Sequence, residues 1–196
     1  MRFIDRNSPP PQLAVWFADE TILDQRHYDG SLPTGVKTAI RDNRVKDQGY
    51  LCAYTMRRIQ EIDVGGQLKF DAHVEHVVTR KSSKQRGALD ETVDYRNLVA
   101  CVNRKGDLPY GASARGDTVE DLPVHPFKPN CAERFRYHLD GKISGVDQDA
   151  RTTICKLKLY HPTLVSFRQS RISASGFGIA RPRTPGVRQL PPQKVS

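Results

Sequence analysis

The 196-residue chain carries 31 Lys and Arg against 22 Asp and Glu, which gives a formal net charge of +9. This length fits one ordinary domain with a sizeable core and excludes a large two-domain enzyme. No run approaches the roughly 18 apolar residues of a spanning helix, and the start lacks the apolar core of a signal peptide. We expect a soluble, cytoplasmic protein with no membrane partner. The excess of base favours an anionic partner, nucleic acid first.

Residues 1–48 are predicted to form an N-terminal arm followed by helices. The arm contains Ser8-Pro9-Pro10-Pro11, and proline removes amide donors and fixes an extended backbone. Apolar spacing then predicts a helix over about 13–26 and another over about 36–46.

Residues 49–120 are predicted to form the core of the domain. Short β-like segments run from 50 to 62, and residues 70–78 alternate well enough for a strand. A polar loop is expected over 79–91. After it, Asp94 is expected to cap a short helix that carries Leu98, Val99 and Val102.

Residues 121–175 are predicted to form a C-terminal hairpin and two helices, after an irregular stretch that spans residues 104–130. Asp140-Gly141 is a strong hairpin turn signal. Helices are expected from Asp147 through Lys158 and from His161-Pro162 onward. Residues 176–196 hold Pro, Arg and Lys but no acid, which is typical of a flexible basic tail.

The four cysteines are far apart in sequence, and none forms a Cys-x-x-Cys pair; they are Cys52, Cys101, Cys131 and Cys155. Secreted disulfide scaffolds and four-cysteine zinc sites both need a different pattern, since each zinc knuckle supplies two thiolates from one tight turn. The spacing therefore predicts reduced thiols, packed mostly as small apolar residues.

The most informative segment joins an acid and a histidine to a basic loop and an asparagine. Glu75-His76 ends the strand over 70–78, and Asn97-Leu98 follows the polar loop. Phosphodiester hydrolysis needs a base that accepts a proton near neutral pH and a centre that stabilises charge on phosphate oxygens. A neutral imidazole and a carboxylate-bound divalent ion meet those needs. Taken singly, the same residues also fit a surface pair, a satisfied histidine and a helix cap.

This order of parts resembles the HNH, or ββα-metal, nuclease motif. The resemblance implies an α+β fold with a ββα-metal core, with His76 as general base and Glu75 as ligand of Mg²⁺ or Mn²⁺. Asn97 would be the central asparagine that orients the histidine loop. Asn103 is the best match for the third position, on the helix, although it lies closer to Asn97 than the usual spacing.

Positive side chains follow His76 in the predicted loop, where a phosphate backbone would run; they are Arg80, Lys81, Lys84 and Arg86. We interpret them as nucleic-acid contacts. His73 has the strand parity of Glu75, and it is assigned no role beyond an auxiliary ligand or a phosphate contact.

The similarity extends over about residues 1–170, to the HNH endonucleases associated with retrons and Septu-type anti-phage systems. It is carried by several segments, which are Gly49-Tyr-Leu-Cys-Ala-Tyr-Thr-Met-Arg-Arg-Ile59, His73-Val-Glu-His76, Asp94-Tyr-Arg-Asn-Leu98, Cys131-Ala-Glu-Arg-Phe-Arg-Tyr137 and the closing stretch from Ala150 to Arg168. The resemblance implies a subunit that cleaves or nicks DNA beside a partner ATPase in antiviral defence.

The chain departs from that family at the cysteines. Members usually carry Cys-x-x-Cys where this chain has Cys52-Ala-Tyr-Thr55, and of a second pair only Cys101 is present, with Tyr110-Gly111 where a cysteine is expected. Two thiolates do not close a tetrahedral shell, so no structural zinc is expected. The proline usual three residues after the base is Thr79.

Three functions from different classes therefore stand at the level of sequence. The first is a metal-dependent HNH endonuclease acting on DNA. The second is a catalytically inactive DNA-binding or adaptor subunit of the same fold that partners an ATPase. The third ignores the resemblance and takes the chain as a basic scaffold protein whose tail binds an acidic partner or RNA.

Overall fold

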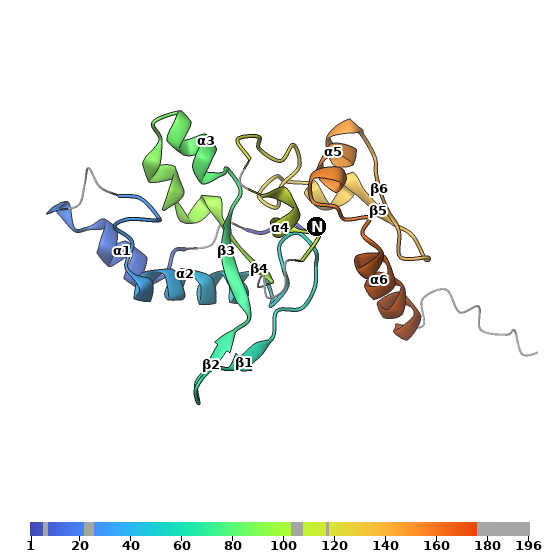
Figure 1. Cartoon of the computed structure of the whole chain (residues 1–196), viewed down its shortest axis with the longest axis horizontal. Coiled ribbons are helices and arrows are strands. Elements are labelled where there is room, and N and C mark those ends of the chain that lie inside the picture. The colour runs from blue at the N-terminus through green and yellow to red at the C-terminus, as the bar shows by residue number, and fades with distance from the viewer. Residues whose placement is uncertain (6–7, 22–25, 103–107, 117, 176–196) are drawn as a thin grey trace, which may run out of the picture.

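The computed structural model describes residues 1–5, 8–21, 26–102, 108–116 and 118–175 and combines helices with small antiparallel sheets (Figure 1). Its α-helices are α1 (Pro11–Phe17), α2 (Thr34–Asp47), α3 (Arg80–Gln85), α4 (Ala112–Arg115), α5 (Gln148–Lys156) and α6 (Pro162–Ala174). Its strands are β1 (Glu61–Asp63), β2 (Leu68–Phe70), β3 (Ala72–His76), β4 (Leu98–Val102), β5 (Phe135–Tyr137) and β6 (Ile143–Gly145). The α+β class predicted from the sequence is confirmed.

The sheet at the centre of the molecule is formed by β3 and β4. They pair antiparallel, with Ala72 opposite Val102 at one end and His76 opposite Leu98 at the other. Helix α2 packs against both strands. Just after α2, the buried Gln48 side chain donates to the Ala100 carbonyl and accepts from the Ala100 amide, each over 2.7–2.8 Å. At Ala100 the backbone groups on the free edge of β4 thereby have the partners that a further strand would supply.

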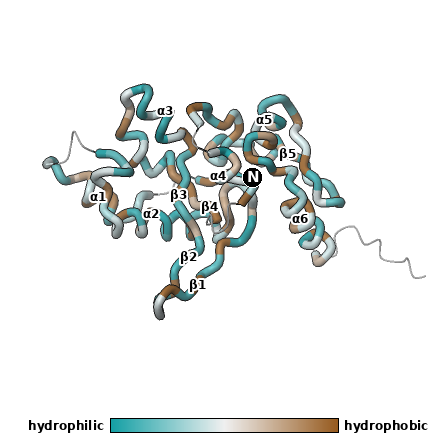
Figure 2. The backbone as a smooth tube through the Cα atoms, in the orientation of Figure 1, coloured by the Kyte–Doolittle hydropathy of each residue, from teal (hydrophilic) through white to brown (hydrophobic). Residues whose placement is uncertain are grey.

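The prediction of a helix after Asp94 is wrong over Leu98–Val102, which form strand β4. Asp94 does cap a helical turn by accepting from the Arg96 amide, but that 3₁₀ helix ends at Asn97. The strand is buried on both faces, so its residues form a continuous apolar run, and such a run does not distinguish a strand from a helix. Figure 2 shows β4 at the centre of the molecule and the more hydrophilic α3 above the sheet.

The segment predicted as a polar loop over 79–91 is also more ordered than expected. Thr79 caps α3 by accepting from the Ser82 amide through its hydroxyl, and a 3₁₀ helix follows at Leu89–Thr92. Because α3 carries no apolar side chain, its sequence lacks the hydrophobic periodicity that marks a helix.

The buried apolar residues form two clusters. The smaller includes Leu13, Trp16 and Ile40, and it packs α1 and α2 against the loop end of the β3–β4 sheet through Leu98. The larger surrounds β4 and reaches α5 and α6 through residues such as Ile154 and Leu164. The central sheet therefore lies between a helical N-terminal part and a helical C-terminal part (Figure 1).

The C-terminal hairpin and two helices are confirmed, although α5 ends at Lys156 and the stretch predicted as irregular over 104–130 contains α4. Strands β5 and β6 form the hairpin around Asp140-Gly141, and Asp147 caps α5 by accepting from the Ala150 amide. Helix α6 begins at Pro162, directly after His161. In the N-terminal part, α1 spans Pro11–Phe17 and is shorter than the helix predicted over 13–26. The predicted tail, 176–196, lies outside the described residues, and no helix within them is long and apolar enough to cross a membrane.

Candidate functional site at the end of β3

His76 is the last residue of β3, and its imidazole is buried and held from two sides. Nε2 lies 2.8 Å from the Thr92 carbonyl oxygen. The Tyr28 ring meets the imidazole edge to face, with 4.8 Å between ring centroids. A carbonyl only accepts hydrogen bonds, so Nε2 carries the proton and Nδ1 carries the lone pair. The contact thereby assigns one nitrogen as donor and leaves the other as the basic atom.

The buried position keeps this imidazole neutral. Burial lowers the pKa of His76 from 6.5 to about 4, and the hydrogen bond to Thr92 opposes that shift only in part. At pH 7 the ring therefore holds a lone pair and no charge. This is the protonation state that a general base requires before it takes up a proton.

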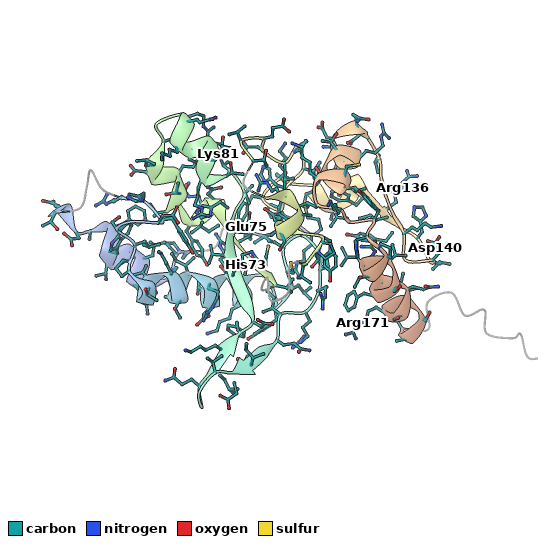
Figure 3. The ribbon with its side chains drawn as sticks, in the orientation of Figure 1. His73, Glu75, Lys81, Arg136, Asp140 and Arg171 are labelled. Atoms are coloured by element: carbon teal, nitrogen blue, oxygen red, sulfur yellow. The ribbon has the colours of Figure 1, made fainter. Side chains whose placement is uncertain are left out.

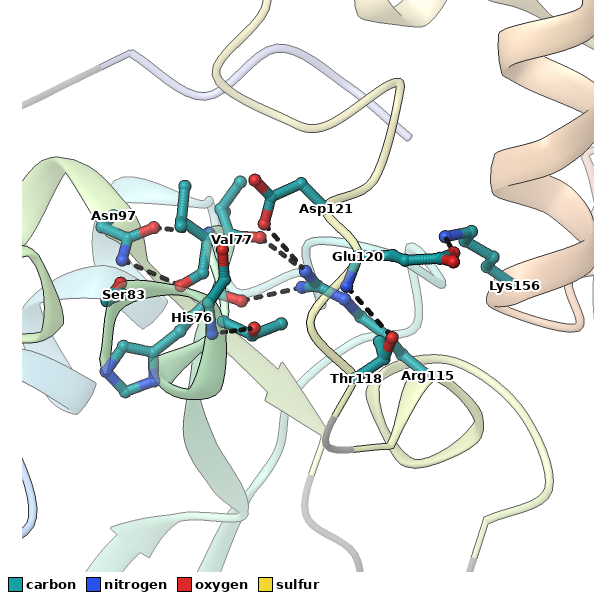
Figure 4. A network of polar contacts seen from close by, with 12 residues as sticks. His76, Val77, Ser83, Asn97, Arg115, Thr118, Glu120, Asp121 and Lys156 are labelled. Atoms are coloured by element: carbon teal, nitrogen blue, oxygen red, sulfur yellow. Dashed lines mark hydrogen bonds and ion pairs between the residues drawn. The ribbon is translucent and has the colours of Figure 1, made fainter. Parts of the chain in front are cut away.

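Asn97 closes the loop that separates β3 from β4. Its Oδ1 accepts from the Val78 amide at 2.7 Å, and its Nδ2 donates to the Val78 and Glu91 carbonyls at 3.1 and 2.9 Å. Figure 4 shows the side chain between these backbone groups. Asn97 fixes the backbone next to His76, and none of its side-chain hydrogen bonds goes to the imidazole. The resemblance implies that a central asparagine contacts both the backbone of the loop and the imidazole, and only the backbone contacts are found.

Arg115, the last residue of α4, holds the same turn from the other side. Its guanidinium donates to the His76 and Val77 carbonyls at 2.8 and 2.7 Å, and it lies 3.9 Å from the Asp121 carboxylate (Figure 4). The side chain is fully buried. Sequence reasoning missed Arg115, because a lone arginine in a predicted irregular stretch carries no signal. Sequence reasoning also missed Tyr28 and Thr92, because nothing in the sequence near either residue indicates contact with His76.

Glu75 lies on the opposite face of β3 from His76. The register places Val99 opposite Glu75 and Cys101 opposite His73, and both belong to the larger core cluster. On that face Nε2 of His73 is 3.5 Å from Oε2 of Glu75. The structure thus brings Asn97 to the loop of His76 but pairs Glu75 with His73. Asn103 lies outside the described residues.

Three of the four predicted cations line a groove of about 610 Å³, which is not lined by His76 itself. Arg80, Lys81 and Lys84 line it together with Tyr28 and Thr92, the two residues that contact the His76 ring.

The four cations differ in their partners. Arg80 pairs with Asp29 and Arg86 with Glu91, whereas Lys81 and Lys84 are exposed and their ammonium groups have no partner within the described residues. Figure 3 shows Lys81 on α3, away from the core. Two of the cations are thus fully available to an anion.

The donors near β3 suit a divalent ion that keeps other ligands of its own. A carboxylate and an imidazole lie within 3.5 Å of each other, but no group of three His, Cys, Asp or Glu able to share an ion occurs within the described residues. An ion held this way takes its other ligands from water and substrate, as Mg²⁺ and Mn²⁺ do at phosphate-transfer sites. The residues present therefore fit such an ion.

The thiols offer a poorer metal site. Burial acts to raise the pKa of both Cys52 and Cys101; the hydrogen-bonding contact between the two thiols raises that of Cys101 further, whereas for Cys52 this contact and others with Thr55 outweigh burial and lower the pKa. Thr55 also contacts Cys52, and a Cβ placed on Gly111 would lie 2.9 Å from Cγ2 of Thr55. The positions at which the resemblance implies zinc ligands thus converge, but they supply two sulfur atoms.

No protein-family model matches the chain, and no curated protein is significantly similar to it. The similarity to the HNH family accordingly depends on the residues given above. It is carried forward as part of a proposal.

Proposed function

We propose that this protein is a metal-dependent HNH-type endonuclease that cleaves or nicks DNA. The observation that carries the proposal is the neutral imidazole of His76, which contacts Tyr28 and Thr92, together with a groove that these two residues line with three of the cations. The order of elements also supports it, because β3 and β4 pair as a hairpin around the histidine loop and α4 follows them, as in a strand–strand–helix unit.

In the proposed mechanism, His76 accepts a proton from water at Nδ1 while Nε2–H stays bonded to the Thr92 carbonyl. Proton uptake creates an imidazolium in a buried place, which the low pKa makes unfavourable in the free protein. A bound phosphodiester brings negative charge to that place and stabilises the imidazolium. Catalysis therefore requires Tyr28 to yield to the substrate, since its ring covers the imidazole.

The DNA backbone is proposed to follow the groove beside α3. Lys81 and Lys84 supply charge without losing an existing ion pair, whereas Arg80 must exchange Asp29 for a phosphate. Such contacts position a nucleic acid without reading its sequence. Binding is therefore expected to weaken steeply as salt rises.

Glu75 is proposed to hold the divalent ion, with Asn103 as the further group that the resemblance implies. When bound, Mg²⁺ or Mn²⁺ supplies the positive charge that stabilises the phosphate and leaving oxygens. Because Glu75 and His76 project from opposite faces of β3, the phosphodiester has to lie across the end of the strand to meet both. The protein's own contribution is to fix that end through Asn97 and Arg115.

A second function, an inactive DNA-binding or adaptor subunit, is favoured by one observation. Glu75 and His76 lie on opposite faces of β3, and Tyr28 covers the imidazole. In both functions the resemblance implies an ATPase partner and a role in anti-phage defence, which are parts of the proposal.

Plasmid nicking in Mg²⁺ or Mn²⁺ tests the proposal, with and without any ATPase encoded beside the chain. We expect His76→Ala to lower the rate about 100-fold or more, the usual contribution of a general base. His138→Ala is the matched control, because His138 is exposed and bonds only Ser144 within the hairpin. DNA binding without nicking under every condition would establish the adaptor, and absence of both would overturn both functions.

A further inference from the structure

The face of β3 opposite to His76 carries two side chains of metal-ligand type. His73 and Glu75 are two residues apart on one strand, so they project to the same side. Both are largely buried, with side-chain exposures of 22% and 13%. Figure 3 shows the two residues on β3, at the centre of the molecule.

The imidazole of His73 lacks the partners that a buried ring normally has. Both Nδ1 and Nε2 are inaccessible to solvent and form no hydrogen bond. Buried polar atoms in folded proteins nearly always have a partner, and an exception calls for an explanation such as an ion. The Glu75 carboxylate is the nearest acid, but at 3.5 Å it is too far for a good hydrogen bond.

That separation fits two ligands of one ion. Transition-metal bonds to imidazole nitrogen and carboxylate oxygen are about 2.0–2.2 Å long. The two donor atoms are 3.5 Å apart. If an ion lies about 2.1 Å from each of them, the donor–ion–donor angle is about 110°, which is close to tetrahedral. The pair is therefore spaced for chelation without a change in the strand.

We propose that His73 and Glu75 together form the protein side of a divalent transition-metal site. The inference deepens the proposed nuclease function, because it assigns a second ligand and a class of metal to the ion beside Glu75. Mg²⁺ prefers an all-oxygen shell, whereas imidazole suits borderline ions such as Mn²⁺, Co²⁺, Ni²⁺ and Zn²⁺. The site is accordingly selective for such ions over Mg²⁺, with water and phosphate oxygens as the other ligands.

Calorimetric titration of the full chain with Mn²⁺, Co²⁺ and Mg²⁺, free of DNA, tests the site. We expect one Co²⁺ or Mn²⁺ per chain, bound more tightly than Mg²⁺. His73→Ala should weaken Co²⁺ binding about tenfold or more, the scale of losses seen even at residues behind metal ligands. His73→Gln, which keeps the size of the side chain, should show the same loss, and His138→Ala should show none. Circular dichroism confirms that each variant is folded.

The outcomes separate this site from the nuclease function. Equal Co²⁺ binding by wild type and both folded His73 variants would overturn the site, as would tighter binding of Mg²⁺ than of Mn²⁺ and Co²⁺. Nicking by the wild type in that case would still support the nuclease. Conversely, His73-dependent binding of Co²⁺ by a chain that never nicks DNA would leave the site standing and remove the nuclease.

Discussion

The two ends of the β3–β4 sheet are held by different physical means. At the loop end, Asn97 and Arg115 bind five backbone groups around His76, Val77, Val78 and Glu91. Around Cys101 the same sheet is held by apolar packing, with one amide side chain, Gln48, on the strand edge. The structure of the loop end depends on the directions of its hydrogen bonds, because hydrogen bonds fix angles. The structure around Cys101 depends on how well side chains fill the available volume.

This difference agrees with the proposal that His76, at the loop end, acts as a base. A base has to be aimed to within a fraction of an ångström, and the polar groups at the loop end provide that aim. The region of Cys52 and Cys101 needs only to be filled. Here Thr55 contacts Cys52 and lies close to Gly111, so packing fills this region.

The largest effect is expected from a substitution that removes hydrogen bonds at the loop end of the sheet. Asn97→Ala removes three hydrogen bonds and leaves buried backbone groups unpaired, so we expect the free energy of unfolding to fall by about 3–5 kcal/mol. Urea denaturation measures it. Arg96→Ala, one residue away and exposed, should change the value by less than about 0.5 kcal/mol. A loss below about 1 kcal/mol for Asn97→Ala would contradict the comparison.

The next effect uses pH to sharpen the contrast. The folded protein holds the pKa of His76 near 4, below its ordinary value of 6.5, so between these pH values the unfolded chain binds a proton that the folded chain does not. His76 therefore does not lower the free energy of unfolding above about pH 6.5, and it lowers it progressively as the pH falls toward 4. Between pH 7 and pH 5, the titration of His76 alone should lower the free energy of unfolding by about 2 kcal/mol.

His76→Gln isolates that contribution, because glutamine retains a donor for the Thr92 carbonyl but does not titrate. Urea denaturation of both proteins at pH 7 and pH 5 measures it, since other titrating groups are common to the pair. The wild type should lose more stability than the variant. Identical losses would mean that the imidazole is not held neutral.

The smallest effect concerns the packed end. Cys52→Ala removes one buried sulfur atom, so the free energy of unfolding should fall by about 1 kcal/mol, and a chelator should change the melting temperatures of the wild type and of this variant equally. Cys155→Ala, at an exposed position, is the control and should be neutral. A fall on adding chelator that is several degrees larger in the wild type than in Cys52→Ala would show that the thiols bind a stabilising metal.

The sequence was most informative where local signals and the final structure agree. Asp147 and His161-Pro162 mark the starts of α5 and α6, and Asp140-Gly141 marks the hairpin, because caps and turns act over a few residues. It was misleading at Leu98–Val102, where burial on both faces removed the periodicity. Local patterns do not encode which residues a segment will be buried between.

The candidate site divides in the same way. The segment from Glu75 to Asn97 was singled out by residue type and order, and the backbone contacts of Asn97 agree with the role that the resemblance implied. The groups that set the state of His76 come from elsewhere. Tyr28 precedes it by 48 residues and Arg115 follows it by 39, so only the folded chain brings them together.

The closeness of Gly111 to Thr55 restricts the order in which these two residues can be substituted. Gly111 has φ +71°, where side chains are disfavoured, and a Cβ there would lie 2.9 Å from Cγ2 of Thr55. A cysteine gained at 111 alone would meet both penalties, whereas Thr55→Cys removes the obstructing methyl group first. The effects of the two substitutions are therefore coupled, and Gly111→Cys is less costly after Thr55→Cys than before it.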